Sequence, residues 1–252
     1  MAVFDSDLAG LAPQVRRIFL VVLLGLTLAA LSCGDQEAQP QATPTTPQSG
    51  ETANLFPNPG FEDGQDPWFS LKEPNFIRTE ALANSGSASA LLQMRDPLEA
   101  EGAKVYYLVQ EIEPTEFPEV LRGYYRVENW KKETPKQYLQ FVVIAFGVDN
   151  LPGGFTNHQI RYPLAGIDSP PFDIGNAYFV FLGKDEPVTG QWVPFEANIA
   201  EDFKRLWGAV PEGFDKLRIL FEVRWDDKIA GQGAPEADVY YDDLYIGPAA
   251  GG

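Results

Sequence analysis

The feature that most constrains the fold of this chain is a series of short runs rich in Val, Ile, Phe, Tyr and Trp, separated by turns of Pro, Gly, Asp and Asn. Helical periodicity is nearly absent. This pattern is typical of an all-β sandwich or barrel. The predicted strands are Ala88–Met94, Lys104–Glu111, Arg122–Trp130, Tyr138–Phe146, Ala177–Leu182, Trp192–Asn198, Lys216–Trp225 and Ala237–Ile246.

The segment "LRILFEVRW" shows the two-residue period of a strand most clearly. Its apolar residues, from Leu217 to Trp225, alternate with a second set that includes Arg218, Glu222 and Arg224. Successive side chains of a strand point to opposite faces. We therefore expect one face of this strand in the core and the other face open to solvent.

One short helix is predicted over Glu201–Trp207, because its apolar residues share a face and Gly208 follows as a stop. It would cover an open end of the sandwich. The stretch Asp149–Gly175 is rich in Pro and Gly and unusually long for a connection. Such a stretch indicates a functional loop or an irregular extra strand pair, to which His158–Leu164 would contribute a strand.

Residues 1–32 are predicted to be a signal peptide, because an uncharged run of fourteen residues, Ile18–Leu31, follows Arg16-Arg17. A membrane-spanning helix needs about 20 such residues. The run ends at "AALSC", which resembles the lipobox of bacterial lipoproteins. The resemblance implies cleavage after Ser32, a diacylglycerol on Cys33 and a fatty acid such as palmitate on the new amino group. The alternative is an ordinary secretory signal with a chance cysteine, although Cys33 is the only cysteine in the chain.

The rest of the chain divides into two parts. Residues 33–52 form a tether rich in Gln, Pro and Thr, which cannot bury a core and is expected to be disordered. Residues 53–248 are globular in composition, and their length suits one domain. We expect an extracytoplasmic protein, held by lipid at the bacterial cell membrane or the outer membrane.

The formal net charge of −17 limits the partners of this protein. A surface of that sign repels nucleic acid and anionic lipid headgroups. It suits a neutral or cationic partner, or serves solubility alone. With Cys33 lipidated the chain has no free thiol, so no disulfide is expected.

Three motifs resemble family 4 and family 9 carbohydrate-binding modules. The stretch "NLFPNPGFEDGQDPW" (54–68) resembles the opening of these modules, and "ADVYYDDLYIG" (237–247) resembles their last strand. Between them, "SGSASALLQM" is similar to a Ser-Gly-x-x-Ser-Leu strand of the family. The resemblance implies a galactose-binding-like jelly-roll β-sandwich, in which the first and last strands lie close together.

The same motifs imply a structural calcium site. Turns at Asn58-Pro59-Gly60 and Asp63-Gly64 flank Phe61, which we expect to plug the core. If the first and last strands are neighbours, Glu62 approaches Asp242, and carboxylates with backbone carbonyls suit Ca²⁺. The alternative is that Glu62 only belongs to a turn and Asp242 only caps a bend.

A face that mixes aromatic and polar side chains predicts a sugar site, because a ring stacks on a pyranose while polar groups hold its hydroxyls. The resemblance implies a groove on the concave sheet. The residues expected to line it are Trp130, Arg126, Tyr124, Glu128, Tyr138 and Gln140. Arg161 and Tyr162 in the long loop are weaker candidates. The alternative is that such aromatics belong to the core, which we expect for Trp68, Phe221 and Tyr241.

No motif in the sequence indicates an enzyme. His158 is the only histidine and is expected at the surface, no serine has a nucleophile-elbow pattern, and no glycosidase carboxylate pair stands out. We therefore expect a non-catalytic carbohydrate-binding protein. Two alternatives stay open: a structural or protein-interaction domain of the cell envelope without a sugar site and, with less support, a glycan-active enzyme.

We predict that Cys33→Ala moves the protein from the membrane fraction to the soluble fraction or leaves the precursor uncleaved. Two or three acyl chains anchor a protein stably, whereas one chain holds it only marginally. Immunoblots of fractionated cells measure both location and processing. Unchanged fractionation with normal processing would contradict the lipoprotein hypothesis.

Overall fold

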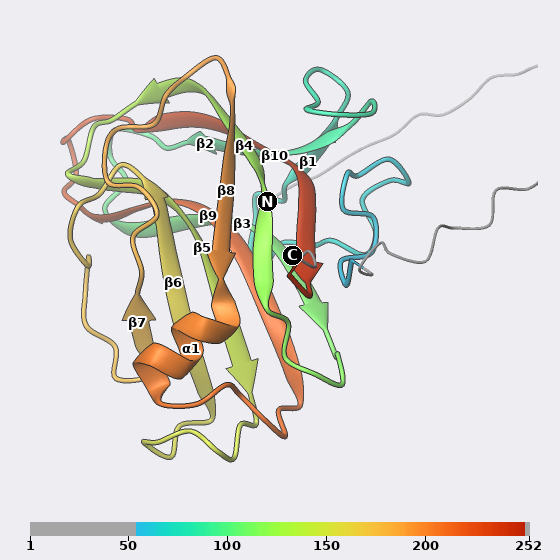
Figure 1. Ribbon diagram of the computed structural model, residues 1–252. Helices are drawn as coiled ribbons and strands as arrows, with labels where there is room; N and C mark the ends of the chain where they lie inside the picture. The colour runs from blue at the N-terminus through green and yellow to red at the C-terminus, as the bar shows by residue number, and fades with distance from the viewer. Residues whose placement is uncertain (1–53, 250–252) are drawn as a thin grey trace, which may run out of the picture. The chain divides into compact units, whose positions relative to one another are not determined.

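The computed structural model describes residues 54–249, which form ten strands and one helix in two packed sheets (Figure 1). The strands are β1 (Ile77–Thr79), β2 (Ser89–Arg95), β3 (Gly102–Ile112), β4 (Val120–Lys131), β5 (Lys136–Phe146), β6 (Asn157–Ala165), β7 (Ala177–Phe179), β8 (Trp192–Asn198), β9 (Lys216–Lys228) and β10 (Glu236–Gly247). The predicted signal peptide, Cys33 and the tether lie outside the described residues. Within residues 54–249, no helix is long and apolar enough to cross a membrane.

The two sheets have five strands each. The first sheet has the order β1-β2-β10-β4-β8, and the second sheet has the order β3-β9-β5-β6-β7. The paired strands are antiparallel except for β6 and β7, which run parallel. This arrangement confirms the predicted fold class, an all-β jelly-roll sandwich with one short helix.

The predicted strands are all present, and His158–Leu164 is the central part of β6. The strand β1 was not predicted, because three residues are too few to show a period of two. The strand β7 is shorter than predicted and ends at Phe179. Beyond it, the backbone N–H groups of Val180 and Leu182 still donate to carbonyls of β6, at 2.9 and 3.0 Å.

The core is centred on Phe221, which is fully buried on β9. Its ring lies 5.0–6.4 Å from five aromatic rings, which come from both sheets and from the opening segment: Phe56, Trp68, Phe141, Phe195 and Tyr241. Burial of each such side chain contributes about 1.5–3 kcal/mol to folding. The prediction that Trp68, Phe221 and Tyr241 belong to the core is confirmed.

The opening motif folds as a turn that seats Phe61 in the core. Phe61 is fully buried, with its ring 5.3 Å from that of Trp68 and 6.3 Å from that of Phe76. Asn58 has a φ of 48°, a left-handed conformation that Asn tolerates, and its amide donates to the Gly64 carbonyl at 2.9 Å. The Trp68 indole N–H donates to the Asn58 carbonyl at 3.0 Å. The turn and the tryptophan therefore form one packed unit.

The helix α1 (Ile199–Trp207) lies at one end of the sandwich (Figure 1). The Asn198 side chain accepts a hydrogen bond from the backbone N–H of Glu201 at 3.1 Å and caps the first turn. Gly208 ends the helix with a φ of 93°. The side chains that the helix buries against the core are Ile199, Phe203 and Trp207.

The position of His158 corrects one expectation. The sequence predicted a surface histidine, but His158 lies on β6 and is fully buried. Its ring lies 4.8 Å from the Trp207 ring and 5.6 Å from the Phe155 ring, and its Nε2 lies 2.9 Å from the Pro152 carbonyl oxygen. Its surroundings are apolar rings from α1 and the preceding loop, so it packs beneath the helix.

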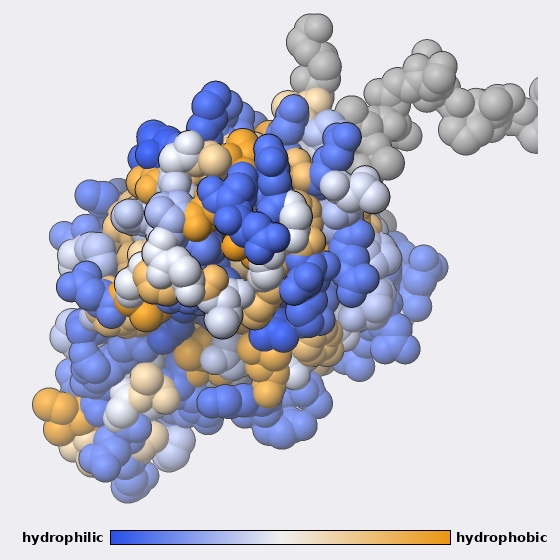
Figure 2. Space-filling view, turned by 90° about the horizontal axis from the view of Figure 1, so that it is seen from below, coloured by the Kyte–Doolittle hydropathy of each residue, from blue (hydrophilic) through white to orange (hydrophobic). Residues whose placement is uncertain are grey.

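The surface of the described residues is largely hydrophilic (Figure 2). Hydrophilic residues dominate the side shown in Figure 2, and apolar residues form separate patches between them. The most exposed large apolar side chain is that of Ile229, at 71 %. Scattered apolar residues of this kind are normal on soluble proteins.

We predict that Phe61→Ala lowers the free energy of unfolding by about 3–5 kcal/mol, because it leaves a cavity between Trp68 and Phe76. Phe69→Ala is the matched control, since Phe69 is 37 % exposed, and it should change stability by about 1 kcal/mol or less. Urea unfolding followed by tryptophan fluorescence measures both. Equal losses would show that the opening motif does not seat a core residue.

Candidate functional site

The candidate site is the outer face of the second sheet, the side that points away from the first sheet. Antiparallel register places Tyr107 of β3 and Gln140 of β5 on either side of Glu222 of β9. The strand period of two then defines the other outward positions. The outward side chains on the four longest strands include Tyr107, Val109 and Glu111; Arg218, Leu220, Glu222 and Arg224; Tyr138, Gln140, Val142, Ile144 and Phe146; and Gln159 and Arg161.

The middle of the outer face is apolar. Four buried residues from three strands form a cluster there that is separate from the main core: Val109, Val142, Ile144 and Leu220. The half-buried rings of Tyr107 and Phe146 pack against this cluster. The four aliphatic side chains are themselves buried, so the two half-buried rings are the apolar area that this part of the face can offer to a flat, ring-shaped ligand.

Beside the apolar cluster lies a buried ion network centred on Arg224. Its guanidinium donates to Glu222 at 3.2 Å and to Asp226 at 2.7 Å. Asp226 also accepts from the Tyr138 hydroxyl at 2.8 Å, and Glu222 accepts from the Gln140 amide. Burial acts to lower the pKa of Arg224, but Glu222, Tyr138 and Asp226 raise it above its ordinary value. Burial also raises the pKa of Tyr138.

Several buried polar atoms of this face have no hydrogen-bond partner within residues 54–249. They are Gln140 Oε1, Arg224 Nε, and Arg161 Nε and Nη1. A buried polar atom without a partner costs about 1–3 kcal/mol, so native structures satisfy most of them. Four such atoms lie on this face, where water or a polar ligand would complete their hydrogen bonds.

Part of the long loop covers this end of the face. The Phe172 ring lies 5.3 Å from the Arg161 guanidinium and 5.4 Å from the Arg224 guanidinium. Pro171 is buried beside it, and its carbonyl accepts from Lys136 Nζ at 2.9 Å. This cover explains why Glu222 and Arg224 are buried. The prediction that this face of β9 is open to solvent is therefore wrong.

The structure divides the predicted sugar-binding residues between two sheets. Tyr124, Arg126 and Glu128 lie on β4 in the first sheet. Tyr138 and Gln140 lie on β5 in the second sheet and are fully buried. The six residues therefore do not line one groove, because β4 and β5 follow each other in sequence but belong to opposite layers.

Trp130 also departs from its predicted position. A β-bulge in β4 places two residues, Asn129 and Trp130, opposite the single residue Ala237 of β10. Asn129 has a φ of 52°. The bulge shifts the alternation, so Trp130 packs partly against the core instead of facing the same way as Arg126. Its indole N–H donates to Glu186 at 2.8 Å.

The remaining β4 residues border a second, smaller site. Arg126 is bonded to Glu128 at 2.6 Å, which ties both side chains to each other. Tyr124 is 36 % exposed, enough for a ligand to reach its ring. It borders a cavity of about 400 Å³ on the first sheet, whose polar lining residues include Arg122, Glu196 and Asp243.

The weaker candidates from the long loop have different positions. Arg161 points outward on β6, beside the ion network. Tyr162 points inward and stacks on Phe141, with ring centroids 4.5 Å apart. Tyr162 is therefore a core residue, and Arg161 belongs to the candidate site.

The residues that sequence reasoning missed are Tyr107, Phe146, Phe172 and the charged residues of β9. Two signals pointed to them. The first signal is that acidic and basic residues alternate with apolar residues along β9. Side chains of opposite charge two residues apart on one face of a strand can form salt bridges, as Arg224 does with Glu222 and Asp226. The sequence "PPF" in an unusually long connection marks an aromatic side chain on a stiff segment.

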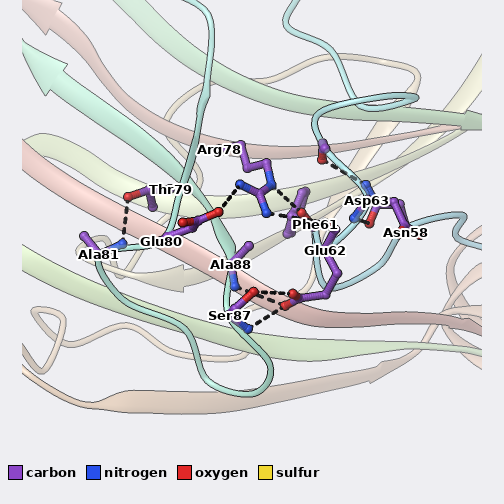
Figure 3. A network of polar contacts seen from close by, with 11 residues as sticks. Asn58, Phe61, Glu62, Asp63, Arg78, Thr79, Glu80, Ala81, Ser87 and Ala88 are labelled. Atoms are coloured by element: carbon purple, nitrogen blue, oxygen red, sulfur yellow. Dashed lines mark hydrogen bonds and ion pairs between the residues drawn. The ribbon is translucent and has the colours of Figure 1, made fainter. Parts of the chain in front are cut away.

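The Glu62 carboxylate holds the segment that precedes β2 (Figure 3). It accepts hydrogen bonds from the backbone N–H and the hydroxyl of Ser87, at 2.8 and 2.6 Å, and from the N–H of Ala88 at 3.0 Å. These donors, Ser87 first, lower the pKa of Glu62. A Cβ on Gly86 would lie 2.2 Å from Glu62 Oε1, so the "SGS" sequence requires a glycine there.

Asp242 holds the same segment from the last strand. It is fully buried and accepts from the N–H groups of Asn84 at 2.7 Å and Ser85 at 3.3 Å. Burial raises its pKa to about 6. The Leu244 N–H donates to the Pro59 carbonyl at 3.1 Å, which confirms that the opening segment and the last strand are neighbours.

These two carboxylates are the predicted calcium ligands. Asp242 is buried without a salt bridge to any basic side chain of residues 54–249, and such a carboxylate suits a bound cation. The same residues contain no group of three or more His, Cys, Asp or Glu side chains that could hold a metal ion. Backbone carbonyls would have to complete the ligand set, and calcium binding stays a prediction.

Comparison with known proteins identifies no family. The sequence matches no protein-family model and no curated protein. Among solved structures, it is similar to TmCBM61 in complex with β-1,4-galactotriose, with 15% identity and a TM-score of 0.41 over 77% of this chain and 98% of that one. It is also similar to the enzymatically active domain of tailspike protein 4 of bacteriophage CBA120, with 15% identity and a TM-score of 0.39 over 77% of this chain and 21% of that one. A mutant of ENZbleach xylanase has 11% identity and a TM-score of 0.31, over 73% and 89% of the two chains.

We predict that Glu62→Ala lowers the melting temperature with or without calcium, because Ser87 and Ala88 lose their acceptor. If Glu62 and Asp242 share a Ca²⁺, added calcium raises the melting temperature of the wild type and leaves Glu62→Ala unchanged, because a ligand of the folded state alone stabilises it. Thermal melts in chelator and in calcium measure both effects. A wild-type melting temperature that calcium does not alter would overturn the calcium prediction.

Proposed function

We propose that this protein is a non-catalytic carbohydrate-binding protein and that the outer face of the second sheet receives the sugar. The observation that carries the proposal is the pairing of two features on that face. One is the pair of half-buried aromatic rings, Tyr107 and Phe146, that pack over a buried apolar cluster. The other is the set of buried polar atoms without partners beside it. A saccharide has complementary features, an apolar C–H face and a rim of hydroxyls.

The expected affinity is modest. Stacking of one ring contributes about 1–2 kcal/mol, by analogy with aromatic pairs, and each hydroxyl hydrogen bond adds about 1 kcal/mol. After the cost of association, dissociation constants in the micromolar to millimolar range are expected. Such weak contacts are useful for a protein that meets long polymers, since neighbouring units of one polymer keep the site occupied.

The arrangement of charges on the face supports binding rather than catalysis. Glycoside hydrolysis requires one carboxyl group that can donate a proton. The carboxylates at the outward positions are all paired with basic side chains, Glu111 with Lys216 and Arg218, and Glu222 and Asp226 with Arg224. Asp226 also accepts from the Tyr138 hydroxyl. Each of these carboxylates is therefore engaged with a basic group of the protein, which supports a binding role for the face.

A second candidate site lies on the first sheet. Its support is the cavity of about 400 Å³ beside Tyr124, where an exposed ring meets Arg122, Glu196 and Asp243. A sugar bound there would use the β4 residues that the sequence first indicated. If neither face binds a saccharide, the structural or protein-interaction domain becomes the better explanation.

The proposal also includes a lipid anchor and a structural calcium ion. The lipobox-like sequence at Cys33 supports a lipid anchor outside the cytoplasm, on the cell membrane or the outer membrane. The tether would hold the domain away from the lipid surface. Glu62 and Asp242 would bind Ca²⁺ as a structural ion, which fixes the segment before β2 and takes no part in sugar binding.

We predict that the intact domain binds at least one soluble polysaccharide and that Tyr107→Ala and Phe146→Ala each weaken binding about fivefold to thirtyfold. Isothermal calorimetry and affinity electrophoresis against a polysaccharide panel measure this. Both rings are half-buried and pack against the apolar cluster, so each variant should lose some stability but remain folded, which thermal melts check.

Tyr124→Ala is the matched control, because it removes an exposed aromatic ring from the other sheet. It should leave binding unchanged. If Tyr124→Ala alone abolishes binding, the site is the cavity on the first sheet. If no polysaccharide binds the intact domain, the proposed function is wrong.

A further inference from the structure

Arg161 is the one arginine of the outer face that lacks a carboxylate partner. Its Nη2 donates to Gln159 Oε1 at 3.0 Å, a neutral acceptor. Its Nε and Nη1 are buried and bond to no other group of residues 54–249. Arg224 differs, since it is bonded to both Glu222 and Asp226.

The nearest carboxylate does not compensate Arg161. Glu222 acts on Arg161 electrostatically, but its own hydrogen bonds go to Arg224 and Gln140. Burial lowers the pKa of Arg161, as expected for a cation removed from water without a counterion. An arginine stays protonated all the same, so Nε and Nη1 remain charged donors without an acceptor within residues 54–249.

The whole outer face has the same bias toward positive charge. The basic side chains of this face are Lys136, Arg161, Lys216, Arg218 and Arg224, one more than the acidic side chains, Glu111, Glu222, Asp226 and Asp227, the last of which pairs with Lys136. The complete chain has a net charge of −17. The local excess therefore runs against the composition of the protein, and it lies on the face to which the proposed function assigns the sugar.

We propose that Arg161 determines the specificity of this face and that the ligand is an acidic saccharide, whose uronic acid carboxylate bonds the free guanidinium N–H groups. The inference rests on the proposed carbohydrate binding and names its substrate class. Hydrogen bonds between a guanidinium and a carboxylate are among the strongest that proteins make, and they discriminate against a neutral analogue.

The position of Phe172 fits this assignment. Its ring lies 5.3 Å from the Arg161 guanidinium and covers the charge by a cation–π contact in the absence of ligand. A carboxylate that reaches Nε or Nη1 takes the place of this ring. The sugar ring that carries the carboxylate then lies toward the apolar cluster between Tyr107 and Phe146.

The test compares acidic oligosaccharides with their own neutral forms. Oligogalacturonate, alginate oligomers and glucuronoxylan oligomers are each titrated by calorimetry beside the same preparation after methyl esterification. At least one acid should bind the wild type about tenfold or more tightly than its ester, the factor that one charge-assisted hydrogen bond contributes. Arg161→Gln should remove that preference and leave the affinity for the ester within about threefold.

Arg205→Gln is the matched control, because it removes the same charge from α1, where Arg205 is exposed and paired with Asp202. It should keep the preference for the acid. Arg161→Gln removes a buried charge without a partner, so its melting temperature should equal or exceed that of the wild type. Should this variant fail to fold, the comparison of acid with ester on the wild type still decides.

The outcomes separate the two proposals. If esters or neutral polysaccharides bind as tightly as the acids, or if Arg161→Gln weakens acid and ester alike, the assignment of Arg161 is wrong while carbohydrate binding stands. If no saccharide of either kind binds, the proposed function fails, and the specificity fails with it.

Discussion

The structure depends on the burial of β9 on both of its faces. The inward face packs the Phe221 ring against aromatic rings of both sheets. The outward face carries the Arg224 ion network. Removing these charges from water is unfavourable unless their hydrogen bonds are satisfied, so the neighbouring strands must supply partners. Tyr138 and Gln140 of β5 meet this requirement, which makes them structural supports of the site as well as parts of it.

This constraint connects the fold to the proposed site. In a sandwich stabilised by its hydrophobic core alone, the outer face of a sheet would be polar and exposed to solvent. Here the face combines an apolar cluster, a paired ion network and one guanidinium, that of Arg161, with two N–H groups that lack an acceptor within the described residues. The paired network holds the strands in register. Within residues 54–249 the Arg161 guanidinium contacts Gln159 and the Phe172 ring but has no carboxylate partner, and that contrast with Arg224 is what points to a ligand.

The fold was largely predictable because the strands show a clear period of two, and the opening and last-strand motifs lie side by side as expected. The site was less predictable for three physical reasons. Strands β4 and β5 are adjacent in sequence but lie in opposite sheets, which depends on tertiary topology. The bulge at Asn129 reverses the direction of Trp130 without any warning in the residue pattern. The burial of Arg224 depends on Phe172, a residue from a distant connection.

The parallel pairing of β6 and β7 explains why that connection covers the site. A parallel pair requires the chain to return along the strand before it re-enters the sheet. The return from Ala165 to the level of Gln159 is about 20 Å, whereas residues 166–176 span about 36 Å when extended. The surplus length lies across the outer face and carries Phe172 with it. A shorter connection would still reach β7. The length of this loop can therefore change how the site is covered while every strand pairing is kept.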